Sequence, residues 1–535
     1  MKSRISNHRH SPRRERGIAL ITALLMTMVF LVLIGALMGQ MIAELGSVGS
    51  HSNSAKALNT AYAGVENMVL NIEESATGAG QQIPPDISYS YAAPSTEHYD
   101  VTVTKAWTTT NGLVYYDIVS TGTETSSGQT RTVEALAKSF PYSYFEQFTA
   151  GNSGNVYYTT GEIFDGPVYN GGSMNVWYQT SSPPIFKSSV TTVTTPTWYE
   201  GVAKTAVATP IWADVTSKGK KSFTIGSNPM ALPGFQSNLQ VASEAFYGDS
   251  THVATLPNTP HNGIFVNGHD ANAGPNAPLT TGLYIEGDAN ITPCSGVCGA
   301  YSGNNEVFTV TPKGAGNPID HSYKIVIDFS ANTTTVVQTT GCAASCSDVY
   351  TGVLSGQPAA GTSVGNGAIF ADGNVTLNTG TIHGAYTISV PDYVSDHSHT
   401  ITLGGAAPGI KYLDKSASSG DELGIWANDI TVNSSTTTGY EFDGSIMTGY
   451  DGECPPCTDG TFKNQDWNGV PQGNFTFFGG LIQNVNGNMG VSSGGSQVSG
   501  FSRVYQYDAR LASNPPPYFP ITNKYDIIAW LDLGR

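Results

Sequence analysis

Hydrophobic positions follow three patterns along this chain, and each pattern predicts a different kind of structure. The first is an unbroken apolar run, because residues 18–43 contain no charged side chain. About 20 apolar residues at a rise of 1.5 Å each span the hydrocarbon core of a bilayer. This run therefore predicts one membrane-spanning helix.

A helical stripe follows the apolar run. Apolar side chains recur at steps of three and four residues, at Leu58, Ala61, Val65, Met68, Val69 and Ile72. Between the run and the stripe, the segment GSVGSHSNS at 46–54 is rich in glycine and serine, which weaken a helix. We expect one long helix over 18–74 that is softened at 39–54.

The second pattern is alternation of apolar and polar residues. It covers 99–107, 113–124 and 130–140, with Asn-Gly and Ser-Gly turn signals between these runs. A three-stranded antiparallel meander is expected here, and the Pro- and Gly-containing residues before it, 75–97, are expected to form a loop. We assign 75–140 to a sheet that packs on the long helix.

The third pattern fills residues 141–500. Short apolar runs recur beside Gly, Asn or Asp, as in GIFVNG (263–268), GAIFADGNVTL (367–377) and FDGSIMTG (442–449). Short strands with such corners, repeated along one axis, favour a β-solenoid, and a pair of β-sandwiches is the alternative. Residues 501–535 contain YDIIAWLDL at 525–533, which we expect to be a final strand that returns to the first sheet.

A basic leader precedes the apolar run. Lys2, Arg4, Arg13, Arg14 and Arg16 outnumber the single acid, Glu15. Positive charge before a membrane helix holds that end in the cytoplasm and places the rest of the chain outside. A cleaved secretory signal needs a small-x-small site, which is lacking here, so a plain anchor and a prepilin signal are the stronger readings.

The block RERGIALITALLMTMVFLVLIGALM at 14–38 resembles the amino-terminal region of PilX-type minor pilins of type IV pili. The resemblance implies a leader at 1–17, cleavage after Gly17 by a prepilin peptidase, and Ile18 as the first mature residue. It also implies the fold class: mainly β with one long N-terminal α-helix, as a pilin-like α+β domain plus a large β-solenoid-like domain.

One position departs from the pilin pattern. Most pilins carry Glu at the fifth mature position, where this chain has Thr22. In the family, this Glu offsets the amino terminus of a neighbouring subunit, and a buried amine without a partner is costly. The absence of Glu is similar to the K-type pseudopilin at the tip of type II secretion fibres, so we hypothesise a tip or near-tip position.

The carboxy-terminal segment YDARLASNPPPYFP, 507–520, resembles the signature of large PilX-like proteins in bacterial pilus clusters. A pilin fold interrupted by a large β domain is similar to the large competence minor pilins. The resemblance is specific over about the first 70 residues and recognisable in the last 30 or so. Between them it depends only on the general character of the sequence.

The composition fits export of the part of the chain that follows the membrane-spanning helix. Charged residues make up 12% of the chain, about half the usual share, and 61 of 535 residues are glycine. The net charge is −17, and the body without its basic leader is more acidic still. An acidic body disfavours broad electrostatic binding to nucleic acid or to anionic lipid.

The six cysteines form three close pairs: Cys294 with Cys298, Cys342 with Cys346, and Cys454 with Cys457. Local pairs in an exported body predict three small-loop disulfides. A zinc site made from the first two pairs is the sharper alternative, although CxxxC spacing is looser than is usual for structural zinc.

Two further clusters are candidate binding residues. His397 and His399 share one face of a strand and could hold a metal ion with Asp392 or Asp396, but two exposed histidines are the simpler interpretation. Lys218, Lys220 and Lys221 follow Trp198, Tyr199 and Trp212, and cations beside aromatic rings bind single-stranded DNA. Solvated loop lysines are the simpler interpretation of that cluster.

We expect a non-enzymatic minor pilin without a cofactor. It would be inserted once in the inner membrane, cut by the peptidase, and joined to other pilins in a surface pilus. Its β domain would serve adhesion to a host or surface ligand, DNA capture, or docking of a tip adhesin. The alternatives are a membrane-anchored β-solenoid that acts on or binds polysaccharide, and a type II secretion pseudopilin.

Overall fold

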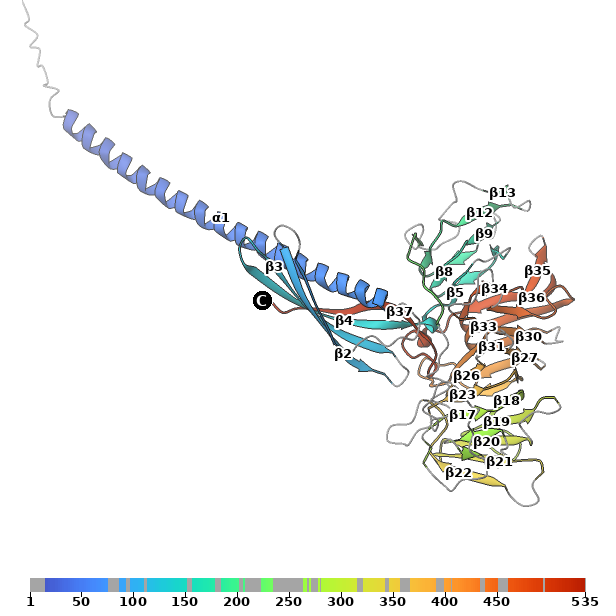
Figure 1. Cartoon of the computed structure of the whole chain (residues 1–535). Coiled ribbons are helices and arrows are strands. Elements are labelled where there is room, and N and C mark those ends of the chain that lie inside the picture. The colour runs from blue at the N-terminus through green and yellow to red at the C-terminus, as the bar shows by residue number, and fades with distance from the viewer. Residues whose placement is uncertain are drawn as a thin grey trace, which may run out of the picture.

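The computed structural model describes residues 15–75, 86–92, 97–109, 113–151, 156–178, 184–201, 205–206, 223–233, 263–266, 269–270, 278–279, 281–314, 321–341, 346–356, 366–390, 399–405, 407–433, 438–450, 460–493 and 496–534. One long helix projects from a small sheet, and a large β domain lies at the far end of that sheet (Figure 1). The fold is mainly β with a single long N-terminal helix.

Helix α1 runs without a break over Glu15–Ser75. The expected softening at 39–54 is therefore not seen as an interruption. Gly46 and Gly49 in this part lie in open space, with nothing within 4 Å of where a Cβ would stand. The predicted stripe does face the sheet: Ala61, Val65 and Ile72 are fully buried.

The small sheet has the order β1-β2-β3-β4-β37, and all its pairs are antiparallel. Its strands are β1 (Asp86–Ala92), β2 (Glu97–Thr108), β3 (Val114–Glu124), β4 (Gln129–Pro141) and β37 (Ile521–Asp532). The meander predicted for 99–140 is therefore present as β2 to β4. The loop expected over 75–97 is wrong in part, because β1 pairs with β2 along seven residues.

Close approach fixes α1 against this sheet. A Cβ at Gly122 of β3 would collide with the backbone of Ala57 and Ala61, and one at Gly64 of α1 would collide with Ser120 and Tyr99. Glycine at these positions lets the helix and sheet backbones meet. The last strand is tied to the same helix, because Lys524 Nζ lies 2.7 Å from Glu73 Oε2 and Tyr525 N donates to Glu73 Oε1.

The large β domain consists mainly of two stacks of parallel strands. The 16-stranded sheet contains β5 (Gln147–Thr149), β8 (Val168–Asn170), β11 (Val190–Thr192), β14 (Phe223–Ile225), β15 (Ile264–Val266), β16 (His269–Asp270), β17 (Leu283–Ile285), β23 (Ala368–Ala371), β25 (Gly380–Ile382), β26 (Ala385–Val390), β28 (Gly409–Tyr412), β29 (Glu422–Ala427), β31 (Tyr440–Thr448), β33 (Pro471–Gln483), β35 (Gly490–Ser493) and β36 (Ser496–Gln506). Because β36 pairs with β33, residues 501–506 belong to this sheet.

The 10-stranded sheet contains β18 (Ala289–Ser295), β19 (Asn305–Pro312), β20 (Tyr323–Asp328), β21 (Thr333–Gln338), β22 (Ser347–Thr351), β24 (Val375–Leu377), β27 (Thr400–Leu403), β30 (Asp429–Val432), β32 (Thr461–Asn464) and β34 (Val485–Asn486). Two smaller sheets contain β6 (Tyr158–Thr159), β7 (Ile163–Phe164), β9 (Asn175–Tyr178), β10 (Ile185–Phe186), β12 (Thr197–Glu200) and β13 (Thr205–Ala206).

From β23 to β34 the chain alternates between the two large sheets, so each circuit stacks on the one before it. Leu377 of β24 pairs with Leu403 of β27, which pairs with Val432 of β30, and all three side chains are buried. Rings stack in the same way: those of Phe442 and Phe477 lie 5.8 Å apart and nearly parallel. One circuit alone could not cover these apolar side chains, so neighbouring circuits stabilise each other.

Candidate functional site

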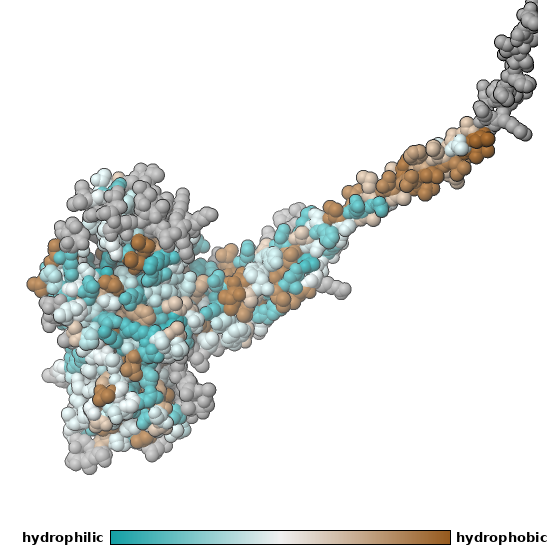
Figure 2. Space-filling view, turned by 180° about the vertical axis from the view of Figure 1, so that it is seen from behind, coloured by the Kyte–Doolittle hydropathy of each residue, from teal (hydrophilic) through white to brown (hydrophobic). Residues whose placement is uncertain are grey.

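The first half of α1 is a fully exposed apolar surface. Its most apolar 18-residue window has none of its residues buried, and within the described residues α1 is the one helix long and apolar enough to cross a membrane. Figure 2 shows this half as a continuous hydrophobic rod that ends where the small sheet begins. A surface of this kind is stable only in lipid or against other apolar helices.

Gly17 and Ile18, the predicted processing residues, lie in the first turn of α1. The structure describes the uncut chain, so cleavage after Gly17 stays a prediction. Thr22 turns its hydroxyl back onto its own helix, where Oγ1 donates to the carbonyl oxygens of Ile18 at 2.9 Å and Ala19 at 3.1 Å. Thr22 therefore offers no negative charge to a neighbouring amine.

The junction between the two parts of the protein is crossed twice by the chain. Outward, β4 leads through a 3-10 turn, η1 (Tyr142–Tyr144), into β5. Inward, the segment 507–520 leads from β36 through the short 3-10 helix η4 (Ala509–Ala512) into β37. The segments bond to each other, because Tyr507 Oη donates to Tyr144 O at 2.8 Å and Ser143 Oγ donates to Leu511 O at 2.8 Å.

The carboxy-terminal signature also fastens itself along the large β domain. Arg510 donates to both carboxylate oxygens of Asp508 and, through Nη1, to Ser419 O at 3.2 Å. Thr387 donates to Pro517 O, and Asn514 donates to Glu422. The role of this motif in the structure is thus to join the sheet on α1 to the stacked strands.

A buried carboxyl lies at the same junction. Glu146, just before β5, is fully buried, and Gly166 N donates to its Oε2 at 2.5 Å. Its Oε1 has no hydrogen-bond partner. Burial raises the pKa of Glu146 to about 8, because desolvation outweighs the bond from Gly166.

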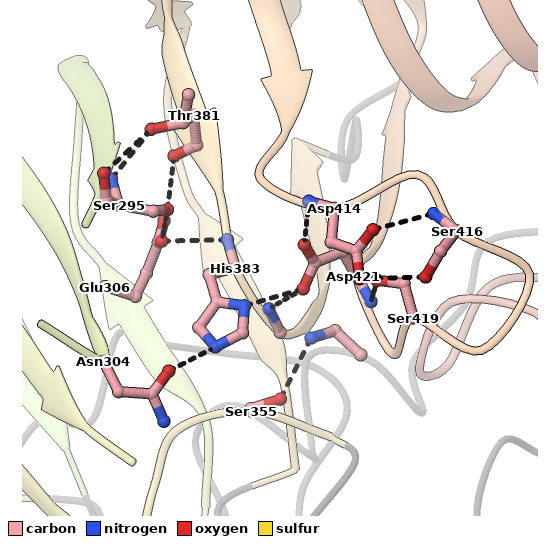
Figure 3. A network of polar contacts seen from close by, with 12 residues as sticks. Ser295, Asn304, Glu306, Ser355, Thr381, His383, Asp414, Ser416, Ser419 and Asp421 are labelled. Carbon is pink, nitrogen blue, oxygen red and sulfur yellow. Dashed lines mark hydrogen bonds and ion pairs between the residues drawn. The ribbon is translucent and has the colours of Figure 1, made fainter. Parts of the chain in front are cut away.

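A polar network lies where the antiparallel strands β18 to β22 meet the parallel stack (Figure 3). His383 Nδ1 is 2.9 Å from Asp421 Oδ1, and its Nε2 is 2.9 Å from Asn304 Oδ1. Glu306 is fully buried and accepts from Ser295 Oγ and from His383 N. Burial raises the pKa of Glu306 well above its ordinary value.

This network resembles a catalytic dyad only in its composition. A serine nucleophile needs a bond to the imidazole, but Ser295 is bonded to Glu306 and to Thr381, not to the His383 ring. Both ring nitrogens of His383 are occupied by Asp421 and Asn304. The arrangement holds the turn after β18 against the corner between β25 and β26. The sequence analysis did not identify the residues of this network.

The predicted binding residues are largely outside the described part of the chain. Lys218, Lys220, Lys221 and His397 lie there, so DNA binding and metal binding at these residues stay predictions. His399 is described. Burial raises the pKa of the nearby Asp372, and His399 partly offsets this rise. Among the described residues, no group of three or more His, Cys, Asp or Glu side chains is arranged to hold a metal ion.

The first predicted cysteine pair forms a bond, since Cys294 and Cys298 are joined by a disulfide with their Cα atoms 5.8 Å apart. Cys346 is also disulfide-bonded, while Cys342, Cys454 and Cys457 lie outside the described residues. A zinc site that used Cys294 and Cys298 as thiolates is incompatible with this disulfide.

Comparison with known proteins assigns this chain to no family. No protein-family model matches this chain, and no curated protein matches it either. Among solved structures, the chain is similar to the crystal structure of the competence-associated pilin ComZ from Thermus thermophilus, with 12% sequence identity. The match covers 90% of this chain and 98% of that chain at a TM-score of 0.25, which is too low to support a conclusion about function.

Proposed function

We propose that this protein is a non-enzymatic minor pilin of a type IV pilus. It is inserted in the inner membrane by α1, cut after Gly17 by a prepilin peptidase, and assembled with other pilins through the apolar half of the helix. The single observation that carries this proposal is α1 itself: a fully exposed, charge-free rod over 18–43 that continues directly into a stripe buried under an antiparallel sheet.

The geometry of α1 fits movement from lipid into a filament core. In both environments the apolar face is covered, so transfer between them costs little hydrophobic free energy, and packing between helices selects the filament. The sheet and the large β domain then lie outside the core. The double crossing at the junction ties the large domain to the assembly helix, so that the domain is displayed for adhesion, DNA capture or docking of a tip adhesin.

Thr22 supports a position at the tip of the filament. Because this position is Thr and not Glu, the subunit supplies no carboxylate for the amino terminus of a neighbour, and its hydroxyl donates within its own helix. A subunit without that carboxylate is disfavoured inside the shaft, where a buried amine would lack its partner. At the tip, this pairing is not required.

The experiment is to label the protein on filaments and to compare the wild type with Thr22→Glu. We expect label at filament ends for the wild type and label along the shaft for Thr22→Glu, because the new carboxylate can pair with an amine. Thr27→Glu is the matched control, since Thr27 bonds back to Ala23 O and Leu24 O in the same manner but lies more than one turn away. Even labelling of wild-type shafts would contradict the tip assignment.

A further inference from the structure

A row of four side chains crosses the small sheet on the face away from α1. Register places Trp107 of β2 opposite Tyr115 of β3, Tyr115 opposite Lys138 of β4, and Lys138 opposite Asp526 of β37. The neighbours of this row in sequence, such as Tyr116 and Ala137, point into the core under α1. Side chains alternate between the faces of a strand, so the row points outward.

A bulge brings the first member into line. The register of β2 on β3 shifts between Lys105 and Trp107, which sets Trp107 beside Tyr115 on the outer face. The two rings stack, with centroids 4.3 Å apart and planes 15° apart. Although one ring face of Trp107 is covered by Tyr115, the residue remains 47% exposed. A tryptophan held in this way is a rigid, accessible aromatic platform.

The two charged members complete the row. No ion pair joins Lys138 to Asp526 or to any other group in the described part of the chain, so the amine and the carboxylate both remain available to a ligand. Partial burial lowers the pKa of Lys138. Neighbouring strands lie about 4.8 Å apart, so the row extends roughly 14 Å across the sheet.

We propose that this row is a binding site for a neutral polysaccharide chain. A pyranose ring has one face of C–H groups, which stacks on an indole, and a rim of hydroxyls, which accept from an amine and donate to a carboxylate. The row supplies these partners in order: the free indole face of Trp107, backed by the Tyr115 ring, then a donor, then an acceptor. The free face of Trp107 can stack one pyranose ring, and Lys138 and Asp526, two and three strands away, can bond the hydroxyls of a linked ring.

Other ligands fit this row less well. Nucleic acid needs several cations for its phosphates, whereas the row has one cation beside a carboxylate on a chain of net charge −17. A protein partner would need a broad apolar surface around the rings, but Thr104, the outward side chain of β2 before the bulge, is polar and exposed. The exposed apolar side chains Ile528, Trp530 and Leu531 lie on β37, the strand at the other end of the row. The site is independent of filament assembly, because no residue of it lies on α1.

The test uses full-length protein in detergent micelles and measures its retention on cellulose and on chitin. We expect wild-type protein to be retained on at least one of them and Trp107→Ala to lower the binding constant at least tenfold. Trp107→Phe should recover part of the loss, since it keeps a ring on Tyr115. Trp530→Ala is the matched control, because Trp530 is also exposed, at 44%, but lies beside Tyr62 of α1 and outside the row.

Failure of wild-type protein to bind either polysaccharide would overturn the proposal, as would equal retention of wild-type protein and Trp107→Ala. Competition by oligothymidine that exceeds competition by cellohexaose would assign the row to single-stranded nucleic acid instead. Because the assay contains no filaments, a negative result would leave the pilin assignment untouched, and a positive result would not depend on that assignment.

Discussion

Replacing Arg503 with Met is expected to destabilise the large β domain by about 3–5 kcal/mol. Arg503 of β36 donates to Glu162, with Nη2 2.6 Å from Oε1, and the same nitrogen donates to Tyr157 O at 3.1 Å. Both members of the ion pair are mostly buried, with side-chain exposures of 18% and 8%. Removing the cation leaves the Glu162 carboxylate inside the protein without its partner, and that penalty dominates the effect.

The measurement is the thermal and denaturant unfolding of full-length protein in detergent. The double variant Glu162→Gln/Arg503→Met should recover most of the loss, because it leaves no buried charge behind. Lys187→Met is the matched control: Lys187 pairs with Asp165 at 2.6 Å, but both side chains are about half exposed. Exposed pairs contribute about 0–1 kcal/mol, so this variant should unfold almost as the wild type does. Equal stability of Arg503→Met and wild type would refute the account of this contact.

The second large effect is a pH dependence centred on Glu146. Its pKa is raised from 4.5 to about 8 in the folded protein. A carboxyl with a raised folded pKa contributes its stability in full below pH 4.5, and this contribution is lost as pH rises through about 8. We therefore expect the wild type to lose stability over this window, with a slope from Glu146 of at most about 1.4 kcal/mol per pH unit.

Glu146→Gln should remove that part of the slope and should melt at a higher temperature than the wild type at pH 8. The amide can accept from Gly166 N as Oε2 does now, without a charge to desolvate. Two other carboxyl groups also have raised pKa values: that of Glu306 lies well above its ordinary value, and that of Asp443 is about 6. Both are present in the variant and in the wild type, so the difference in stability between the two proteins reports on Glu146. Glu134→Gln on the outer face of β4 controls for the change in net charge. Parallel melting curves of wild type and Glu146→Gln across pH 5–8 would contradict the prediction.

The elements built from local pattern were predictable from sequence. The charge-free run and the apolar residues spaced three and four positions apart predicted α1. The alternation of apolar and polar residues predicted β2 to β4. Repeated units also proved to be spatial neighbours: FDGSIMTG of β31 lies in register on FGGLIQNVNG of β33, with Gly444 opposite Gly479. Both glycines have positive φ, 144° and 150°, and a Cβ on Gly479 would strike the Gly444 backbone. Matching glycines in the two segments therefore let the strands approach closely at this point.

The contacts that join distant parts were not predictable. Arg503 and Glu162 are more than 300 positions apart, and nothing in either neighbourhood marks the other. The row from Trp107 to Asp526 depends on a one-residue bulge in β2 and on the return of β37 beside β4, and neither has a local signal that fixes its register. Strand β1 was missed although its sequence, DISYSYA, alternates polar residues with Ile and Tyr, because the Pro and Gly residues around it favoured a loop.

Amino-terminal sequencing of the protein recovered from sheared surface filaments tests the central claim most directly. If α1 carries the chain from the membrane into a pilus, the mature protein begins at Ile18 in cells with the prepilin peptidase, and it is absent from filaments in cells without it. A chain that still begins at Met1 and stays with the membrane in peptidase-competent cells would contradict the assignment.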